Sequence, residues 1–135
     1  MTHNGDYSGL TEAQKARYDR QIRVWGADAQ ERIQGSRVLF CGLSGLNAEA
    51  IKNAVLAGIS ICLQDSRKVC MDDLSSAGYF LQVEDVGKDI VDAALPRIQE
   101  LNTFAQVTSE RRRIENLEDS FFCGFNVISV ADSSD

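Results

Sequence analysis

Apolar residues follow two different spacings along this chain, and the two spacings alternate. Short apolar runs bounded by glycine or polar turn residues are typical of buried strands. We predict such strands at Arg37–Cys41, Ile59–Gln64, Ala105–Thr108 and Phe125–Val130. Elsewhere apolar residues recur at every third or fourth position, which is the spacing of a helix with one buried face. The alternation predicts an α/β fold built on a doubly wound sheet.

The helical spacing is found in five segments, which are Thr11–Trp25, Ala27–Ile33, Ala48–Ala57, Val86–Leu101 and Ile114–Phe122. A short helical turn is also expected near Met71–Leu74. Thr11 is a suitable N-cap, because Gln14 stands three residues later and completes a capping box. Pro96 lies inside the fourth segment, where it removes a backbone donor and clashes with the previous turn, so we expect a kink or a break there.

A glycine turn joins the first predicted strand to the next helix, and together with the second strand it fills residues 37–65. That length is typical of a βαβ unit with parallel strands. Gly42 and Gly45 would let backbone N–H groups and the positive end of the helix approach a phosphate. Asp65 follows the second strand, where an acidic side chain typically holds a ribose hydroxyl. These three residues are candidate nucleotide-binding residues.

The glycine pattern is incomplete, because Asn47 stands where a third glycine would be expected. A glycine there permits close packing of the helix or close approach of the ligand. The added bulk of asparagine should weaken a nucleotide site. The turn therefore has two interpretations, a functional nucleotide contact and a structural or vestigial connection.

The net charge of the 135-residue chain is −6, with 25% charged residues. This balance predicts neither nucleic acid nor a membrane surface as a partner, because both attract clustered Lys and Arg. The one basic run, residues 111–113, is expected to be a solvated loop or strand end. No apolar stretch approaches the ~20 residues that a membrane span needs.

None of the four cysteines belongs to a C-x-x-C pair, so neither a zinc site nor a redox motif is predicted. Cys41 and Cys62 lie in apolar runs and are expected to be buried thiols. Free thiols without an export signal indicate a reducing compartment, the nucleus or the cytoplasm.

The segment Tyr18–Gly26, which reads Y-D-R-Q-I-R-V-W-G, precedes the first strand and is not explained by composition. It resembles the opening signature of the ubiquitin-like-modifier activating enzymes, and later motifs such as L-A-G-I at 56–59 and L-N at 101–102 follow in that family's order. The resemblance covers residues 11–135; residues 1–10 are expected to form a disordered tail. It implies a Rossmann-like adenylation fold, truncated after the fourth strand. Residues 11–135 are thus predicted to be the N-terminal part of a ThiF-like domain.

The same resemblance implies an inactive, or pseudo-adenylation, domain. Active members carry an Asn-Arg-Gln stretch after the ribose-binding aspartate and a basic pair around a V-G-(K/R) segment. Here residues 76–80 read S-A-G-Y-F, and only Lys88 remains of the basic pair. Such cations neutralise phosphate charge while a carboxylate attacks ATP. Gly42, Gly45, Asp65 and Lys88 are therefore expected to form a vestigial site, with no cofactor in this chain and with ATP and Mg²⁺ in a catalytic partner.

In this family the inactive half extends an arginine from its first helix towards the partner's ATP phosphates, and the matching residue is Arg20. A cation supplied across an interface follows the logic of an arginine finger. The alternative for Arg20 is a surface ion pair with Asp19 or Asp28. The modifier would be contacted only indirectly. No metal site is expected in this chain, although Asp132 and Asp135 stand near the family's metal position.

Within the family the likeness is to the small, non-catalytic subunit of the SUMO-activating enzyme. The inactive halves of the neddylation- and ubiquitin-activating enzymes stay open, and so does a self-sufficient adenylating homodimer. An NAD(P)-binding Rossmann oxidoreductase, from a different class, would explain Gly42, Gly45 and Asp65 but not Tyr18–Gly26. An exposed last strand also predicts that the isolated segment can pair with a second copy.

Overall fold

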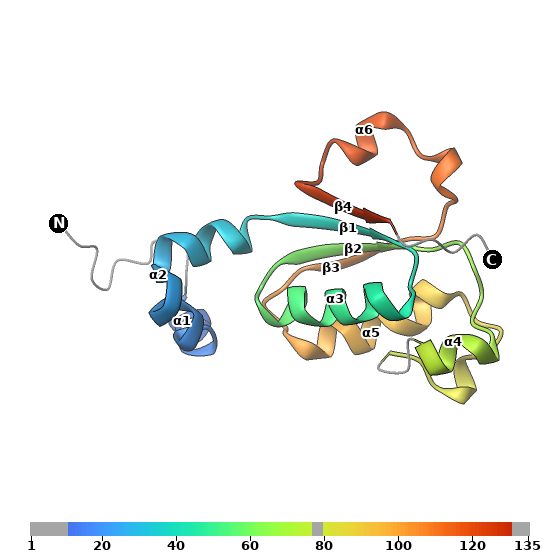
Figure 1. Cartoon of the computed structure of the whole chain (residues 1–135), viewed down its shortest axis with the longest axis horizontal. Helices are drawn as coiled ribbons and strands as arrows, with labels where there is room; N and C mark the ends of the chain where they lie inside the picture. The colour runs from blue at the N-terminus through green and yellow to red at the C-terminus, as the bar shows by residue number, and fades with distance from the viewer. Residues whose placement is uncertain (1–10, 77–79, 131–135) are drawn as a thin grey trace.

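Four parallel strands form the centre of the protein, in the order β3-β2-β1-β4 (Figure 1). This computed structural model describes residues 11–76 and 80–130. The strands are β1 Arg37–Cys41, β2 Ser60–Gln64, β3 Val107–Glu110 and β4 Val127–Val130. β1 pairs with β2 on one side and with β4 on the other. Strands β2 and β3 therefore extend the sheet on one side of β1, and β4 extends it on the other side. This order confirms the predicted doubly wound α/β arrangement.

The helices lie on both faces of the sheet and beyond one end of it (Figure 1). Their bounds are α1 Glu12–Arg17, α2 Asp19–Gln34, α3 Gly45–Leu56, α4 Met71–Ser76, α5 Ile90–Leu101 and α6 Asp119–Phe122, with 3₁₀ turns η1 Val83–Asp85 and η2 Ile114–Asn116. α3 and α5 cover one face, whereas α6 lies over the other. α1 and α2 lie beyond the amino end of β1. In the described parts of the chain, no helix is long and apolar enough to cross a membrane.

α3 and α5 begin at residues other than those predicted. α3 starts at Gly45 rather than Ala48, because the Ser44 hydroxyl accepts a hydrogen bond from the Asn47 N–H at 3.3 Å and caps the helix earlier. α5 starts at Ile90, since residues 86–89 form a turn in which Gly87 has a φ of 93°. Of the kink or break expected at Pro96, the break is wrong, because α5 continues through it; the kink stays a prediction.

The N-terminal helices confirm one predicted boundary and add another. Thr11 caps α1, and Gln14 completes the predicted capping box. Gly26, with a φ of 88°, kinks α2 at the boundary predicted between two helices. The predicted helix from residue 11 to 25 is nevertheless divided at Tyr18, whose backbone leaves helical geometry and whose side chain is buried.

The C-terminal boundaries also differ from the prediction. β3 begins two residues later, because Ala105 closes a turn by donating its N–H to the Asn102 carbonyl at 3.2 Å. The predicted helix over residues 114–122 is divided into η2 and α6, with extended backbone at Leu117 between them. β4 begins at Val127 and not at residue 125, after Asn126 donates its N–H to the Arg37 carbonyl at 2.8 Å.

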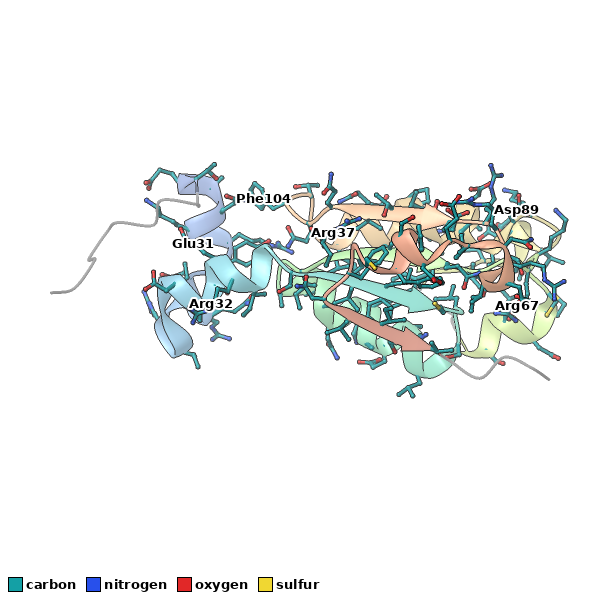
Figure 2. All side chains as sticks on the ribbon, turned by 90° about the horizontal axis from the view of Figure 1, so that it is seen from above. Glu31, Arg32, Arg37, Arg67, Asp89 and Phe104 are labelled. Atoms are coloured by element: carbon teal, nitrogen blue, oxygen red, sulfur yellow. The ribbon has the colours of Figure 1, made fainter. Side chains whose placement is uncertain are left out.

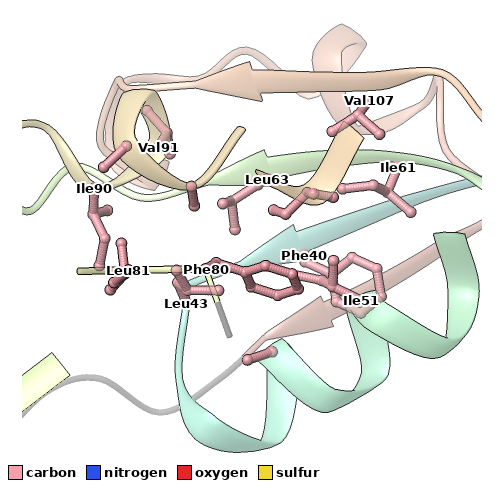
Figure 3. Packing of buried hydrophobic residues seen from close by; sticks show 14 of the residues in the cluster. Phe40, Leu43, Ile51, Ile61, Leu63, Phe80, Leu81, Ile90, Val91 and Val107 are labelled. Atoms are coloured by element: carbon pink, nitrogen blue, oxygen red, sulfur yellow. The ribbon is translucent and has the colours of Figure 1, made fainter. Parts of the chain in front are cut away.

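The main hydrophobic core lies between the sheet and the helices α3 and α5 (Figure 3). Its largest members include Phe40, Leu43, Ile51, Leu63, Phe80 and Ile90. On the opposite face, Leu39, Cys41 and Cys62 pack under aromatic residues of the segment 121–125. Burial raises the pKa of both thiols, so these cysteines are the buried apolar groups that the sequence predicted.

Each arginine of the basic run at residues 111–113 has an acidic partner. The pairs are Arg111 with Asp89 and Asp92, Arg112 with Glu110, and Arg113 with Glu115. All three arginines are exposed, which confirms a solvated loop. Their charge is offset locally, so the run does not form an unpaired basic patch.

β4 is an edge strand of the described sheet, and it presents apolar side chains to solvent. Val127 is 55% exposed and Val130 is 65% exposed. Such an edge can template pairing with another strand. Pairing of the isolated segment with a second copy stays a prediction.

Candidate functional site

The glycine turn lies at the carboxyl end of β1 and leads directly into α3. Gly42 has a φ of 96°, a conformation that favours glycine, and its N–H donates to the Gln64 carbonyl of β2 at 2.7 Å. Gly45 is the first residue of α3. The positive end of this helix therefore lies at the edge of the sheet where such folds bind ligands.

Asp65 lies beside the turn, as predicted, but its carboxylate is already engaged. Oδ2 accepts from the Leu43 N–H at 2.9 Å and from Arg67 Nη2 at 2.9 Å. Oδ1 accepts from the Arg67 backbone N–H at 2.9 Å and from Arg67 Nε at 3.0 Å. The side chain is only 3% exposed. Each oxygen thus has two donors, which uses the acceptor capacity that a ribose would need.

Asn47 fills the space next to the turn and is 2% exposed. Its Nδ2 donates to the Gly42 carbonyl at 2.8 Å and also approaches the Cys41 carbonyl at 3.4 Å. Its Oδ1 accepts from the Ser129 hydroxyl of β4 at 3.0 Å. The side chain braces the turn between two strands, which supports the structural interpretation of the turn.

Lys88 is exposed and pairs with Asp85 at 3.6 Å. Arg97 donates to the same carboxylate, and the Gln82 N–H donates to it at 2.8 Å. The hydrogen bond from Arg97, with the backbone hydrogen bond from Gln82 and the nearby charge of Lys88, holds the pKa of Asp85 below its ordinary value of 3.8. Lys88, the candidate basic residue, therefore contacts a carboxylate of its own chain in this structure.

The lowered pKa of Asp85 predicts a stability that depends on pH. A carboxyl whose folded pKa lies below its unfolded pKa stabilises the fold above the unfolded value and loses that contribution as pH falls through the folded one. Asp85→Asn should cost about 2 kcal/mol at pH 7, because a buried charge-assisted network loses its anion. The cost should shrink progressively as pH falls below about 4, the pKa of the unfolded carboxyl, and through the lower folded pKa of the wild-type carboxyl.

Urea unfolding of wild type and Asp85→Asn, at pH values from about 2.5 to about 7, measures the effect. Glu84→Gln is a matched control, because Glu84 is exposed on the same 3₁₀ turn. If the free energies of unfolding of wild type and Asp85→Asn changed with pH in parallel, the stabilising role of the ionised Asp85 carboxylate would be contradicted.

Arg20 lies far from the glycine turn of its own chain. α2, which carries it, lies beyond the amino end of β1, whereas the turn follows the carboxyl end (Figure 1). Figure 2 shows the same separation, with Glu31 and Arg32 of α2 at one end and Arg67 at the other. The five residues of β1 alone span roughly 15 Å. The structure thus brings Gly42, Gly45 and Asp65 together but does not join Arg20 to them.

The Arg20 side chain is exposed and, among the residues that the structure describes, has no hydrogen-bond or ion-pair partner. Asp19, one of the expected surface partners, pairs instead with Arg23 at 3.0 Å. A solvated arginine with no internal partner is available to an external anion.

Buried polar side chains anchor α2 to the body of the domain. Asn102, 2% exposed, donates Nδ2 to the Tyr18 hydroxyl and to the Val55 carbonyl, the latter at 3.0 Å. Gln30, which is fully buried, donates to the Ala57 carbonyl at 3.0 Å. The bond from Asn102 to Tyr18 fixes the start of the helix two residues before Arg20, because Tyr18 directly precedes α2.

Sequence reasoning missed Arg67 and gave Asn102 no role. The position of Arg67, two residues after the ribose-type aspartate, was a usable signal, since that spacing lets a guanidinium fold back on the carboxylate. Asn102 carried no such signal, because its partners are 47 and 84 positions away.

Within the described residues, no group of three or more His, Cys, Asp or Glu side chains could hold a metal ion. Asp132 and Asp135, the two candidates for the family's metal position, lie outside the described residues, and so does the expected tail at residues 1–10.

The parallel 3-2-1-4 sheet, the glycine turn after its first strand and the acidic residue after its second define a doubly wound α/β domain of the Rossmann-like class. Residues 18–135 match the model of the ThiF family, and the chain belongs to that family.

The curated relatives are longer than this chain. It is 40% identical over 134 residues to SUMO-activating enzyme subunit 1 of Dictyostelium discoideum, covering 98% of this chain and 40% of the relative. The human protein of the same name is 40% identical over 123 residues, covering 90% and 35%. The E. coli tRNA N6-threonylcarbamoyladenosine dehydratase TcdA, solved in complex with ATP, shares the fold with a TM-score of 0.78 at 21% identity, over 90% of this chain and 51% of that one.

Proposed function

We propose that this chain is part of the non-catalytic subunit of a heterodimeric activating enzyme for a SUMO-type modifier. Its similarity to proteins named SUMO-activating enzyme subunit 1 supports this proposal over the neddylation and ubiquitin alternatives. Residues 11–135 would be the first part of its pseudo-adenylation domain. The modifier and the partner's ATP would both be reached through the heterodimer, in the nucleus or the cytoplasm.

The observation that carries the proposal is the contrast between Arg20 and Asp65. Arg20 is solvated and has no partner among the described residues, at the opposite end of β1 from its own glycine turn. Asp65, which would hold a nucleotide ribose in this chain, is saturated by internal donors. As they stand, the residues of this chain's own turn do not fit a nucleotide.

The chemistry assigned to the enzyme is adenylation. The modifier's C-terminal carboxylate attacks the α-phosphorus of ATP, an acyl-adenylate forms, and pyrophosphate leaves. Negative charge builds on the phosphates during this attack, and a cation directed at them stabilises it. Arg20 is proposed to provide that cation to the partner's site, where ATP and Mg²⁺ bind.

ATP–pyrophosphate exchange tests the function directly. The full-length protein should support exchange when it is mixed with its catalytic subunit and the modifier, and it should give none alone. Exchange by the full-length protein without a partner would favour the self-sufficient homodimer and overturn the proposal. Saturable binding of NADH would support the oxidoreductase alternative, which no specific observation in the structure favours.

A further inference from the structure

All three guanidinium nitrogens of Arg67 donate hydrogen bonds to groups in or beside the glycine turn. Nε and Nη2 form a fork on the Asp65 carboxylate, at 3.0 and 2.9 Å. Nη2 also donates to the Leu43 carbonyl within the turn, at 3.2 Å. Nη1 reaches Asp73 at 3.3 Å. A forked arginine–carboxylate pair has a defined geometry, so the side chain is held in one place.

Asp73 extends this arrangement to α4. Its side chain is 7% exposed, and its second oxygen accepts from the Cys70 N–H at 2.9 Å. Two buried carboxylates thus share the Arg67 guanidinium, and its removal would take away a cation that both of them contact. The negative charges of Asp65 and Asp73 therefore favour the observed position of the Arg67 guanidinium.

The contact of Arg67 with Asp65 is one that a bound nucleoside would use. In nucleotide-binding βαβ units the acidic residue after the second strand accepts hydrogen bonds from the ribose hydroxyls. A guanidinium edge offers two parallel N–H donors to a carboxylate, much as a ribose diol offers two O–H donors. We propose that Arg67 is an internal ligand, which occupies the ribose position of this chain's glycine turn and keeps adenosine nucleotides out of it.

This inference rests on the proposed function and deepens it. Two side chains close the glycine turn: Arg67 binds the Asp65 carboxylate, and Asn47 binds the Gly42 carbonyl. A heterodimer built with this subunit would then have one adenine-nucleotide site, in the partner, and Arg67 would help to decide which half binds ATP.

Arg112 provides a matched control, because it repeats the same local geometry on the next strand. It follows Glu110 by two residues and forms a fork on that carboxylate, with both distances 3.0 Å. Glu110 is the last residue of β3, and Asp65 directly follows Gln64, the last residue of β2. Removing either arginine deletes one forked ion pair at the same edge of the sheet, but only Arg67 contacts the glycine turn.

The test measures binding of ATP with Mg²⁺, and of adenosine, to the full-length chain by isothermal titration calorimetry. Arg67→Ala should bind both at least ~10-fold more tightly than wild type, because the freed carboxylate regains charge-assisted hydrogen bonds to ribose. Arg67→Lys, which keeps a charge between the two aspartates but cannot form a fork, should give a smaller gain. Arg112→Ala should bind as weakly as wild type.

Equal affinities of wild type, Arg67→Ala and Arg67→Lys would overturn the inference, and so would an equal gain in Arg112→Ala. A second measurement does not depend on any variant folding. The Leu43 amide resonance of the wild-type chain should stay fixed during a titration with ATP and Mg²⁺. A saturable shift of that resonance would also overturn the inference.

The two proposals fail separately. Partner-dependent pyrophosphate exchange, combined with unchanged nucleotide binding by the Arg67 variants, would reject the internal ligand and retain the subunit function. Enhanced binding by Arg67→Ala without any exchange in the mixed enzyme would reject the subunit function alone.

Discussion

Arg20→Ala is expected to lower ATP–pyrophosphate exchange by the purified heterodimer about a thousandfold, the lower end of the effect of an arginine finger. The cause is the loss of a cation beside phosphates that gain negative charge as pyrophosphate leaves. Arg20 is exposed, so the free energy of unfolding of the chain should change by no more than ~0.5 kcal/mol. Exchange should therefore fall while folding stays intact.

Arg23→Ala is the matched control for Arg20. Arg23 is exposed on the same helix and pairs with Asp19, an exposed i,i+4 ion pair that contributes only about 0.5 kcal/mol. Its removal should change exchange by less than about threefold, the rate equivalent of that energy. Arg20→Lys should retain part of the rate, since it keeps the charge but loses the fork.

Gel filtration must show the Arg20→Ala subunit still bound to its partner, so that a lower rate reports on chemistry and not on assembly. Exchange at the wild-type rate by that intact heterodimer would contradict the role of Arg20. In that case Arg20 would be an ordinary surface arginine.

Asn102→Ala is expected to destabilise the chain by about 3 kcal/mol, the largest stability effect of a single polar residue that we predict. The substitution removes the donor to the Tyr18 hydroxyl and the Val55 carbonyl, and the acceptor of the Phe104 N–H at 3.0 Å. Tyr18 is buried, so its hydroxyl would be left with no partner among the described residues. The buried Val55 carbonyl would keep the hydrogen bond that it accepts from the Gly58 N–H at 3.0 Å. Unpaired buried groups cost more than the average hydrogen bond contributes.

Urea unfolding followed by circular dichroism measures the loss. Tyr18→Phe should cost about 1 kcal/mol, because it removes one hydrogen bond and no packing. Asn53→Ala, at an exposed position of α3, should change stability by less than ~0.5 kcal/mol. An Asn102→Ala protein as stable as the Asn53 control would show that the anchor contributes nothing.

Loss of the Asn102 anchor should also weaken the proposed function. Tyr18 precedes the first turn of α2, and Arg20 stands in that turn. When the buried end of the helix is released, Arg20 loses its fixed position, and misplaced catalytic groups lose rate steeply. Exchange by an Asn102→Ala heterodimer should therefore be lower than wild type even at temperatures where the chain is folded.

In the parts of the chain that the structure describes, the sequence predicted the type of every strand and long helix, because periodicity is a local property. Alternation of short apolar runs with helical spacing is enough to indicate a doubly wound sheet. Apart from the break expected at Pro96, the errors fell at boundaries, which depend on single residues such as caps and glycines. Ser44 extended α3 towards the turn, and Gly87 delayed the start of α5. The break at Tyr18 had no local signal, since it depends on a partner 84 positions away.

For the candidate site, the sequence by itself determined the family resemblance, the glycine turn, the weakened third-glycine position and the choice of Arg20. These are matters of residue type and order along the chain. Only the tertiary structure decided the state of Asp65, because that depends on which donors the fold brings to its oxygens. It also separated Arg20 from its own turn by the length of β1. Folding places charges and hydrogen-bond partners in space, and a sequence pattern alone does not contain those distances.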